Sequence, residues 1–327
     1  MTTESTILER LRRIATHPAA QGLTDDVAII GDLVLTHDTI AEGVHFLSED
    51  PPESVGWKLV AVNLSDLAGK GAEPVGGLLS LTLTGDDQWE ARFLTGIAAA
   101  CESYGLPLVG GDTVALPGGA PRVLGLTAIG RAGDQAPPRS GGKAGDALWL
   151  VGTVGDSAAG LALLLDDAAA EGPLVDIYRR PIPLLDAGCR LAPFAHAMMD
   201  VSDGLLLDAR RLAEASGCGA VIDLDSLPLS AAFVAERSAD LAARLFAATG
   251  GDDYALLAAF PDGFDPALRL SLPSGPTLTR IGSLVAPGSP LSLVSDGRTV
   301  PLPEKLGFEH AGDDNLDDDA APMGDRP

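Results

Sequence analysis

The sequence is poor in aromatic and basic residues. Aromatic side chains make up 4% of its 327 residues, and 22 lysines and arginines stand against 46 acidic residues, giving a formal net charge of −24 at pH 7. Proteins bind single-stranded nucleic acid on stacked aromatic side chains, and any nucleic acid on a basic surface. We therefore expect no nucleic-acid partner. An anionic substrate would need metal ions or a few local arginines to neutralise its charge.

Cysteines and long apolar runs are also scarce. The three cysteines, Cys101, Cys189 and Cys218, are too few and too scattered for a disulfide framework or a zinc site. The first twenty residues carry acidic side chains and show no signal-peptide pattern, and the longest uncharged apolar run, near 158–165, is too short to span a bilayer. We expect a cytoplasmic protein that does not bind membranes.

Three common site motifs are missing. Neither Gly-Lys pair, at 69–70 or 142–143, has the upstream Gly and the downstream Ser or Thr of a Walker A loop. The segment 200–204 lacks the acids that an EF-hand needs at its third and fifth positions, and no histidine accompanies a GxSxG nucleophile elbow. Any use of ATP must therefore depend on another kind of phosphate site.

The sequence does contain aspartates beside Gly, Thr or Ser in five separate segments. A single such residue is most simply a solvated loop acid or a helix N-cap, but the recurrence favours one metal site built from distant segments. Hard cations such as Mg²⁺ take oxygen ligands, usually one or two carboxylates each with water and substrate phosphates, so many acids indicate several ions and phosphoryl transfer. The acids are Asp25, Asp26, Asp38, Asp66, Asp112, Asp200 and Asp203.

The pattern of apolar residues predicts an α/β or α+β protein in two parts, residues 1–138 and 139–310. A stretch rich in Gly and Pro, 132–145, reads as the linker, and the acidic tail 311–327 has almost nothing to bury and should be disordered. The predicted helices are 4–16, 55–67, 88–104, 157–165, 205–216 and 231–247. The predicted strands are 33–37, 76–84, 106–109, 123–129, 147–151, 220–224 and 254–259.

A set of strings from the first helix to about His310 resembles the thiamine-monophosphate kinase family, part of the aminoimidazole ribonucleotide synthetase-like superfamily. The string EGVHF at 42–46 and the late GF at 307–308 favour this family over its relatives. The other strings are DDVAII, LTHDTIAEGVHF, GWKLVAVNLSDLAGKGAEP, VGGDT, RSGGKAGD, VGTVGDSAAGL, MDVSDGL, GGDDYALL and GFEH.

The resemblance implies the two-domain fold of that superfamily and direct transfer of the γ-phosphoryl group of ATP to thiamine monophosphate, giving thiamine diphosphate and ADP. It also implies several Mg²⁺ ions and a homodimer formed through the N-terminal domain, to which the alternating run 76–84 could contribute a strand. Two alternatives remain open at this point. One is another ATP-dependent member of the superfamily acting on a purine-pathway amidine, and the other is a non-catalytic acidic module that binds cations.

The resemblance implies three sets of site residues. The implied metal ligands, of which Asp66, Asp112 and Asp203 are assigned to catalysis, are Asp26, Thr36, His37, Asp38, Asp66, Asp112, Asp200 and Asp203. The implied nucleotide-binding residues are Tyr104, Gly111, Asp112, Arg139 and Ser202. The implied acceptor-binding residues are His45, Asp252 and Phe308.

Two of these positions depart from the family pattern. His37 stands where the family usually has Ser or Thr, so a hydroxyl contact to metal is lost there, although a backbone carbonyl could replace it. Asp252 stands where the family usually has Glu, which shortens that side chain by one methylene. The predicted role of Arg139 as a phosphate clamp fits the bidentate geometry of a guanidinium, and an aromatic face at Phe308 fits a cationic thiazolium.

Overall fold

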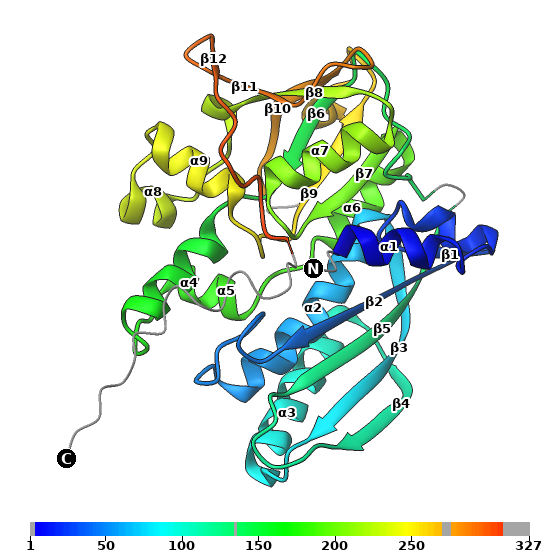
Figure 1. Cartoon of the computed structure of the whole chain (residues 1–327), viewed down its shortest axis with the longest axis vertical. Helices are drawn as coiled ribbons and strands as arrows, with labels where there is room; N and C mark the ends of the chain where they lie inside the picture. The colour runs from blue at the N-terminus through cyan, green and yellow to red at the C-terminus, as the bar shows by residue number, and fades with distance from the viewer. Residues whose placement is uncertain (1–3, 134–135, 270–275, 310–327) are drawn as a thin grey trace.

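The computed structural model describes residues 4–133, 136–269 and 276–309, and the predicted acidic tail lies outside these ranges. It has two halves, each built on its own β-sheet, stacked one above the other in Figure 1. This arrangement confirms the mixed α/β architecture expected from the sequence. None of the described helices has the length and apolarity needed to cross a bilayer.

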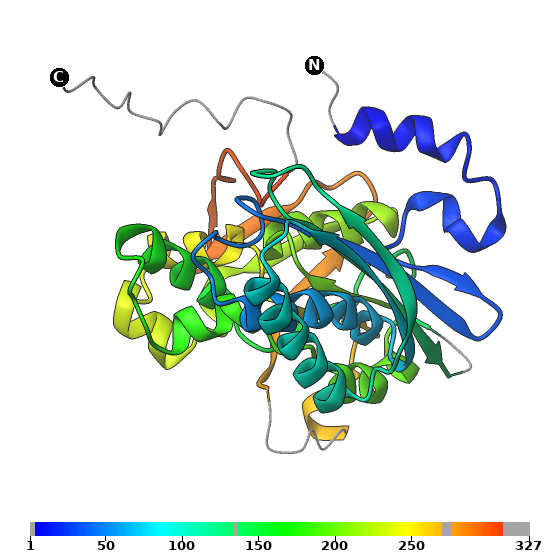
Figure 2. The same cartoon turned by 90° about the horizontal axis from the view of Figure 1, so that it is seen from below.

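The first half is a five-stranded sheet in the order β1-β2-β5-β3-β4. Strands β3 and β4 run parallel with helix α3 between them in sequence, and the other neighbours are antiparallel. The strands are β1 (Ala28–Ile30), β2 (Leu33–Ala41), β3 (Ala72–Leu83), β4 (Leu108–Ala115) and β5 (Val123–Ala132). The helices are α1 (Glu4–Arg12), η1 (Pro18–Leu23), α2 (Pro52–Gly69) and α3 (Asp87–Tyr104), of which α1 stands out to one side in Figure 2.

The second half is a seven-stranded sheet in the order β12-β11-β8-β10-β6-β9-β7. The strands are β6 (Ala147–Val151), β7 (Ala197–Val201), β8 (Gly219–Asp223), β9 (Ala255–Phe260), β10 (Leu278–Val285), β11 (Ser292–Ser295) and β12 (Arg298–Val300). The longer helices are α4 (Asp156–Asp166), α5 (Pro173–Arg179), α6 (Leu185–Leu191), α7 (Leu205–Ala215), α8 (Ala231–Arg237) and α9 (Leu241–Thr249). The short ones are η2 (Ala192–Phe194), η3 (Leu224–Ser226) and α10 (Pro266–Arg269).

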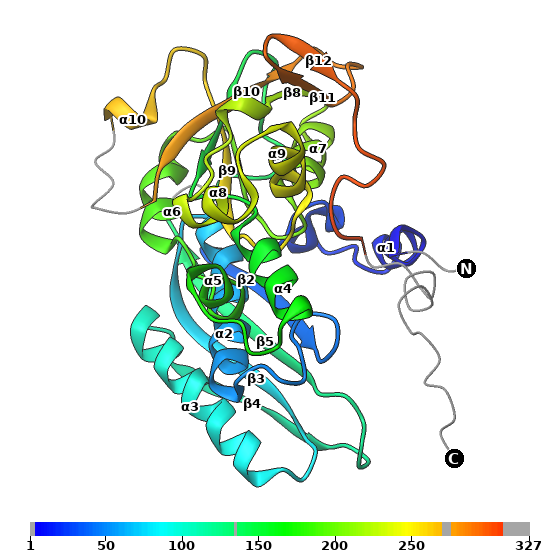
Figure 3. The ribbon, with the colours of Figure 1, turned by 90° about the vertical axis from the view of Figure 1, so that its left-hand side faces the viewer.

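Helix α2 lies between the two halves and is buried along nearly its whole length (Figures 1 and 3). It contacts β2, β3 and β5 of the first sheet and α6 and β7 of the second half. On a third side it contacts α3, where a Cβ on Gly56 would come within 2.3 Å of the Phe93 carbonyl oxygen. Because glycine permits this close approach, α2 is fixed against its neighbours, and so are the polar side chains that it carries.

The structure corrects two predicted elements. The helix predicted at 231–247 is broken, because Ser238 has a left-handed φ of 74° and Asp240 caps a new helix by accepting a hydrogen bond from the Ala243 N–H. The strand predicted at 106–109 is instead β4, which continues to Ala115. The predicted boundary at 138/139 lies between the last strand of the first sheet and the first strand of the second.

Candidate active site

A cavity of about 350 Å³ is lined by residues of both halves. The first set of lining residues, the acidic cluster, consists of Asp26, Asp38, Asp66, Asp200 and Asp203. The second set, the acceptor group, consists of His45, Tyr178, Asp252, Tyr254 and Phe308. The cavity therefore combines a strongly anionic surface with an aromatic one.

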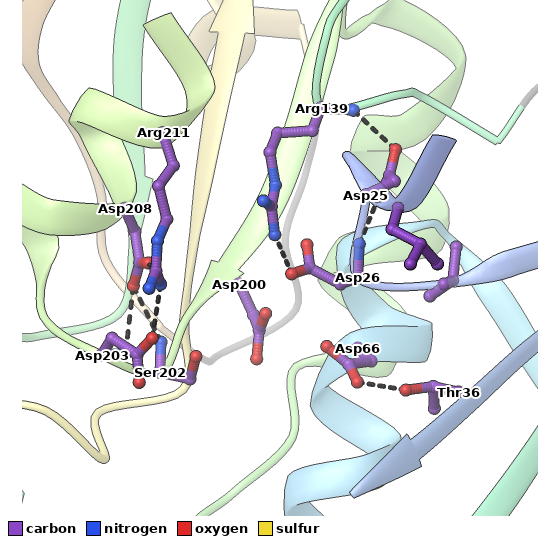
Figure 4. A network of polar contacts seen from close by, with 12 residues as sticks. Asp25, Asp26, Thr36, Asp66, Arg139, Asp200, Ser202, Asp203, Asp208 and Arg211 are labelled. Atoms are coloured by element: carbon purple, nitrogen blue, oxygen red, sulfur yellow. Dashed lines mark hydrogen bonds and ion pairs between the residues drawn. The ribbon is translucent and has the colours of Figure 1, made fainter. Parts of the chain in front are cut away.

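Three carboxylates meet at the centre of the acidic cluster. Each of Asp26, Asp66 and Asp200 offers an oxygen that lies within 4.8 Å of the other two (Figure 4). Asp26 precedes β1, Asp66 is near the C-terminal end of α2, and Asp200 is on β7. The fold thus brings together three of the aspartates that the sequence pattern singled out.

Hydroxyl and amide groups hold the acidic side chains in place. The Thr36 hydroxyl donates to Asp66, and the Ser65 hydroxyl donates to Asp200 at 2.6 Å. The Asn63 side-chain oxygen accepts the backbone N–H of Asp38 at 2.9 Å. Since Asn63, Ser65 and Asp66 all belong to the buried helix α2, this helix carries one acid of the cluster and orients acids from two other segments, β2 and β7.

Burial and mutual repulsion raise the pKa values of three carboxyl groups in the acidic cluster, those of Asp38, Asp66 and Asp200. Burial, with the charges of Asp26 and Asp203, raises the pKa of Asp38 to about 6. Burial, with the charge of Asp26, raises the pKa of Asp200 to about 8, and the pKa of Asp66 also lies well above its ordinary value because of burial and the charge of Asp38. Such a site gains from a bound cation.

The residues fit a hard divalent cation. All the donors are oxygens, and one buried oxygen, Asp26 Oδ2, has no hydrogen-bond partner among the described residues. Mg²⁺ prefers carboxylate and water oxygens, and it would offset the repulsion among these acids. Asp26, Asp66 and Asp200, with Asp38 beside them, are the residues that would hold it.

These pKa shifts predict that the metal-free protein loses stability as the pH rises. A carboxyl whose folded-state pKa exceeds its ordinary value of 3.8 contributes stability that is lost as the pH rises through the folded-state pKa, here about 6 for Asp38 and about 8 for Asp200. Thermal melts in EDTA should therefore give a higher Tm at about pH 5.5 than at about pH 8.5, and Mg²⁺ should reduce the difference. A Tm that increases over this range would contradict the assignment.

Two arginines form ion pairs with acids of the cluster (Figure 4). Arg139 pairs with Asp26 and donates its backbone N–H to Asp25 at 3.0 Å, so the predicted phosphate clamp contacts a carboxylate here and does not line the cavity. Arg211 pairs with Asp203 and lies 3.0 Å from Asp208.

Asp208 belongs to this network although the sequence reasoning assigned it no role. It is fully buried and accepts the backbone N–H groups of Ser202 and Asp203, both at 3.1 Å, so it shapes the loop that presents these two residues to the cavity. Burial and the charge of Asp203 raise the pKa of Asp208 to about 7. Its place at the end of the string MDVSDGLLLD was the signal available in the sequence.

Arg139 and Thr36 contact the acidic cluster without lining the cavity, and four other predicted site residues lie away from it. Gly111 and Asp112 are on the exposed strand β4, and Tyr104 packs edge-on against Trp57 with ring centroids 5.5 Å apart. The imidazole of His37 hydrogen-bonds to the Thr127 hydroxyl at 2.9 Å on the exposed side of the sheet. His37 points away because side chains alternate along a strand, so that when Thr36 and Asp38 face the site His37 faces the other side of the sheet.

The three predicted acceptor residues do line the cavity. His45 accepts the Ala41 N–H at its Nδ1 atom, at 3.1 Å, so its neutral form carries the proton on Nε2. The backbone N–H of Phe308 donates to the Asp203 carbonyl at 2.8 Å. This bond ties the late GF segment to the loop that carries an acid of the cluster.

Comparison with known proteins agrees with this geometry. The family model for the N-terminal domain of AIR synthase related protein matches residues 24–132, and the model for its C-terminal domain matches residues 143–265. Thiamine-monophosphate kinase of Salmonella typhimurium is 37% identical over 301 residues, which cover 88% of this chain and 91% of the relative. The corresponding protein of Caulobacter vibrioides is 36% identical over 323 residues, which cover 94% of this chain and 91% of the relative.

Solved structures show the same relationship. AaThiL complexed with AMPPCP and TMP superposes with a TM-score of 0.80 at 31% identity, covering 94% of this chain and 97% of the other. Thiamine-monophosphate kinase from Stenotrophomonas maltophilia gives a TM-score of 0.71 at 35% identity, covering 90% and 96%. The chain therefore belongs to the thiamine-monophosphate kinase family.

Proposed function

We propose that this protein phosphorylates thiamine monophosphate with ATP, releasing thiamine diphosphate and ADP. The observation that carries the proposal is the shared cavity, in which the acidic cluster and the acceptor group lie together in a chain that belongs to this family. A related structure of the same fold was solved as a complex with AMPPCP and TMP. The reaction is a direct in-line transfer without a phosphorylated enzyme intermediate.

The chain contributes mainly position and charge balance, as is usual in phosphoryl transfer. Both reactants are anions, so the acidic cluster would repel them on its own. We propose that Asp26, Asp66 and Asp200 hold Mg²⁺, which would supply the positive charge that offsets the phosphate charges of both reactants. Ser65 and Thr36 keep two of these carboxylates oriented, and the acceptor group holds the thiamine end of the substrate in line.

The decisive assay incubates the purified protein with ATP, Mg²⁺ and thiamine monophosphate and measures thiamine diphosphate. Product that depends on all three supports the proposal, and excess EDTA should abolish it. ATP consumption without thiamine diphosphate would point to another acceptor. The cytoplasmic location expected from the sequence stays a prediction.

We also propose that two copies of the chain pair along β4. Every residue of this edge strand is exposed, including Leu108 at 42%, Val109 at 63% and Val114 at 51%. A long apolar edge strand with unpaired N–H and C=O groups is a template for pairing with another chain. Gly111 and Asp112 lie on the same strand, so the nucleotide contacts that we propose for them would be made at the interface between subunits.

The Val109→Lys variant is expected to be monomeric, because it places a charge in the middle of the proposed interface. Light scattering after size-exclusion chromatography would compare its mass with that of the wild type. Leu268→Lys is the control, since Leu268 is 86% exposed on α10, away from β4, and its substitution should leave the mass unchanged. A monomeric wild type, or a dimeric Val109→Lys, would contradict this interface.

A further inference from the structure

Lys58 is a buried lysine in the middle of α2 whose three N–H groups all have acceptors. Its side chain is 2% exposed, and Nζ lies 2.6 Å from Asp252 Oδ2 and donates to the His45 carbonyl at 2.9 Å. The third acceptor is the ring of Tyr178, whose centre lies 4.1 Å from Nζ. All three partners line the cavity, whereas Lys58 does not.

The segment that carries Asp252 has an unfavourable backbone conformation. Asp252 and Tyr254 have left-handed φ angles of 66° and 53°, which residues other than glycine rarely adopt. Backbone bonds hold the segment against the β7 end, where the Asp252 N–H donates to Ser202 at 2.7 Å and the Tyr254 N–H donates to Val201 at 2.8 Å. Strain of this kind persists where surrounding contacts enforce it and is common at binding sites.

The Asp252 carboxylate is held from both sides. Lys58 binds Oδ2, and the Tyr254 hydroxyl donates to Oδ1 at 2.8 Å. The next residue, Asp253, is anchored separately, since both of its oxygens accept the Gly155 N–H at 2.9 Å at the start of α4. The direction in which Asp252 faces the cavity is therefore set by its neighbours, and of the two described side chains that bind its carboxylate Lys58 is the charged one.

We propose that Lys58 is a positioning residue for the phosphate acceptor: it fixes Asp252, His45 and Tyr178 in one arrangement that recognises the thiamine end of the substrate. The inference rests on the proposed function. Because its charge is already paired with Asp252, Lys58 is not a phosphate-binding lysine. It holds Asp252 oriented as an acceptor toward a ligand that offers N–H donors and a cationic ring, as thiamine monophosphate does.

The test is a kinetic comparison of Lys58→Met with the wild type. We expect the KM for thiamine monophosphate to rise by about tenfold or more, with a smaller change in kcat and with the KM for ATP unchanged within about twofold. A residue with only a structural role would not separate the two KM values. An unchanged acceptor KM, or an equal rise in both values, would overturn the inference.

Lys70→Met is the matched control. Lys70 is 1% exposed on its side chain, lies 2.6 Å from an Asp25 oxygen and donates to the Met198 carbonyl at 3.0 Å, and neither of these partners lines the cavity. The substitution removes a similarly buried positive charge at the C-cap of the same helix, α2, without touching the acceptor group. We expect it to lower the Tm as Lys58→Met does while leaving the acceptor KM unchanged.

The double variant Lys58→Met/Asp252→Asn keeps the test decisive if Lys58→Met folds poorly. It leaves no unpaired carboxylate, so its Tm should recover, while its acceptor KM should stay elevated because the arrangement is lost. Recovery of both the Tm and the acceptor KM would show that Lys58 merely neutralises Asp252. If the wild type does not phosphorylate thiamine monophosphate, the proposed function and this inference both fail. If the wild type is active and both variants have a normal KM for thiamine monophosphate, only the inference fails.

Discussion

Asp66→Asn is expected to lower turnover by about 10²- to 10³-fold or more while raising the Tm of the metal-free protein. Asp66 is buried against Asp26 and Asp200, and its pKa lies well above the ordinary value because of burial and the Asp38 charge. The asparagine keeps the shape but removes a charge that destabilises the metal-free fold at neutral pH. The same charge is needed to hold cations between two anionic reactants.

Asp32→Asn is the control for this experiment. Asp32 forms an exposed pair with Arg131 at 2.8 Å, and pairs of this kind contribute little to stability. Turnover under saturating substrates and thermal melts in EDTA should be normal for this variant. Near-normal turnover in Asp66→Asn would refute the proposed metal site, and a lower Tm in EDTA would refute the repulsion argument.

Local patterns in the sequence predict the long elements of the first half well. The apolar periodicity of α2 and α3 and the alternation in β3 appear in the structure with shifts of a few residues at their ends. β4 was predicted too short because it contains adjacent glycines, which usually indicate a turn. Here Gly111 is required inside the strand, since a Cβ at this position would come within 2.0 Å of the Leu79 carbonyl oxygen.

The shorter elements of the second half were harder to predict. β12 has three residues, too few for a periodic pattern, and β7 is buried on both faces, so it lacks the alternation that marks a half-exposed strand. The break between α8 and α9 combines the N-cap at Asp240 with the left-handed φ of Ser238, which carries no special signal in the sequence. These errors concern the strands and helices around the site more than the site residues themselves.

Some residues of the site could likewise be predicted from the sequence, and others could not. Aspartates in Gly and Ser contexts predicted the acidic cluster, and family strings supplied the acceptor residues. Lys58 was missed because its importance comes from burial and from a partner distant in sequence, and Asp208 because its importance comes from burial and from the backbone N–H groups of the preceding loop. A single lysine within the otherwise apolar stretch VGWKLVAV was the available signal, since such a residue must find a buried partner.

Free thiamine is expected to be a poor acceptor, with kcat/KM lower than for thiamine monophosphate by a factor on the order of 10⁴. The acidic cluster and the ions that we propose it holds are arranged for phosphate oxygens, which both neutralise the charge and present the nucleophile. Thiamine offers one hydroxyl in place of a phosphate group, so these polar groups would stay unsatisfied when it binds. The aromatic acceptor group lies in the same cavity and is proposed to contact the rings of thiamine, so thiamine should compete with thiamine monophosphate while reacting slowly. Initial rates on the two acceptors, together with inhibition by thiamine, measure these effects separately. Comparable rates would show that the acceptor phosphate is not what the acidic cluster recognises.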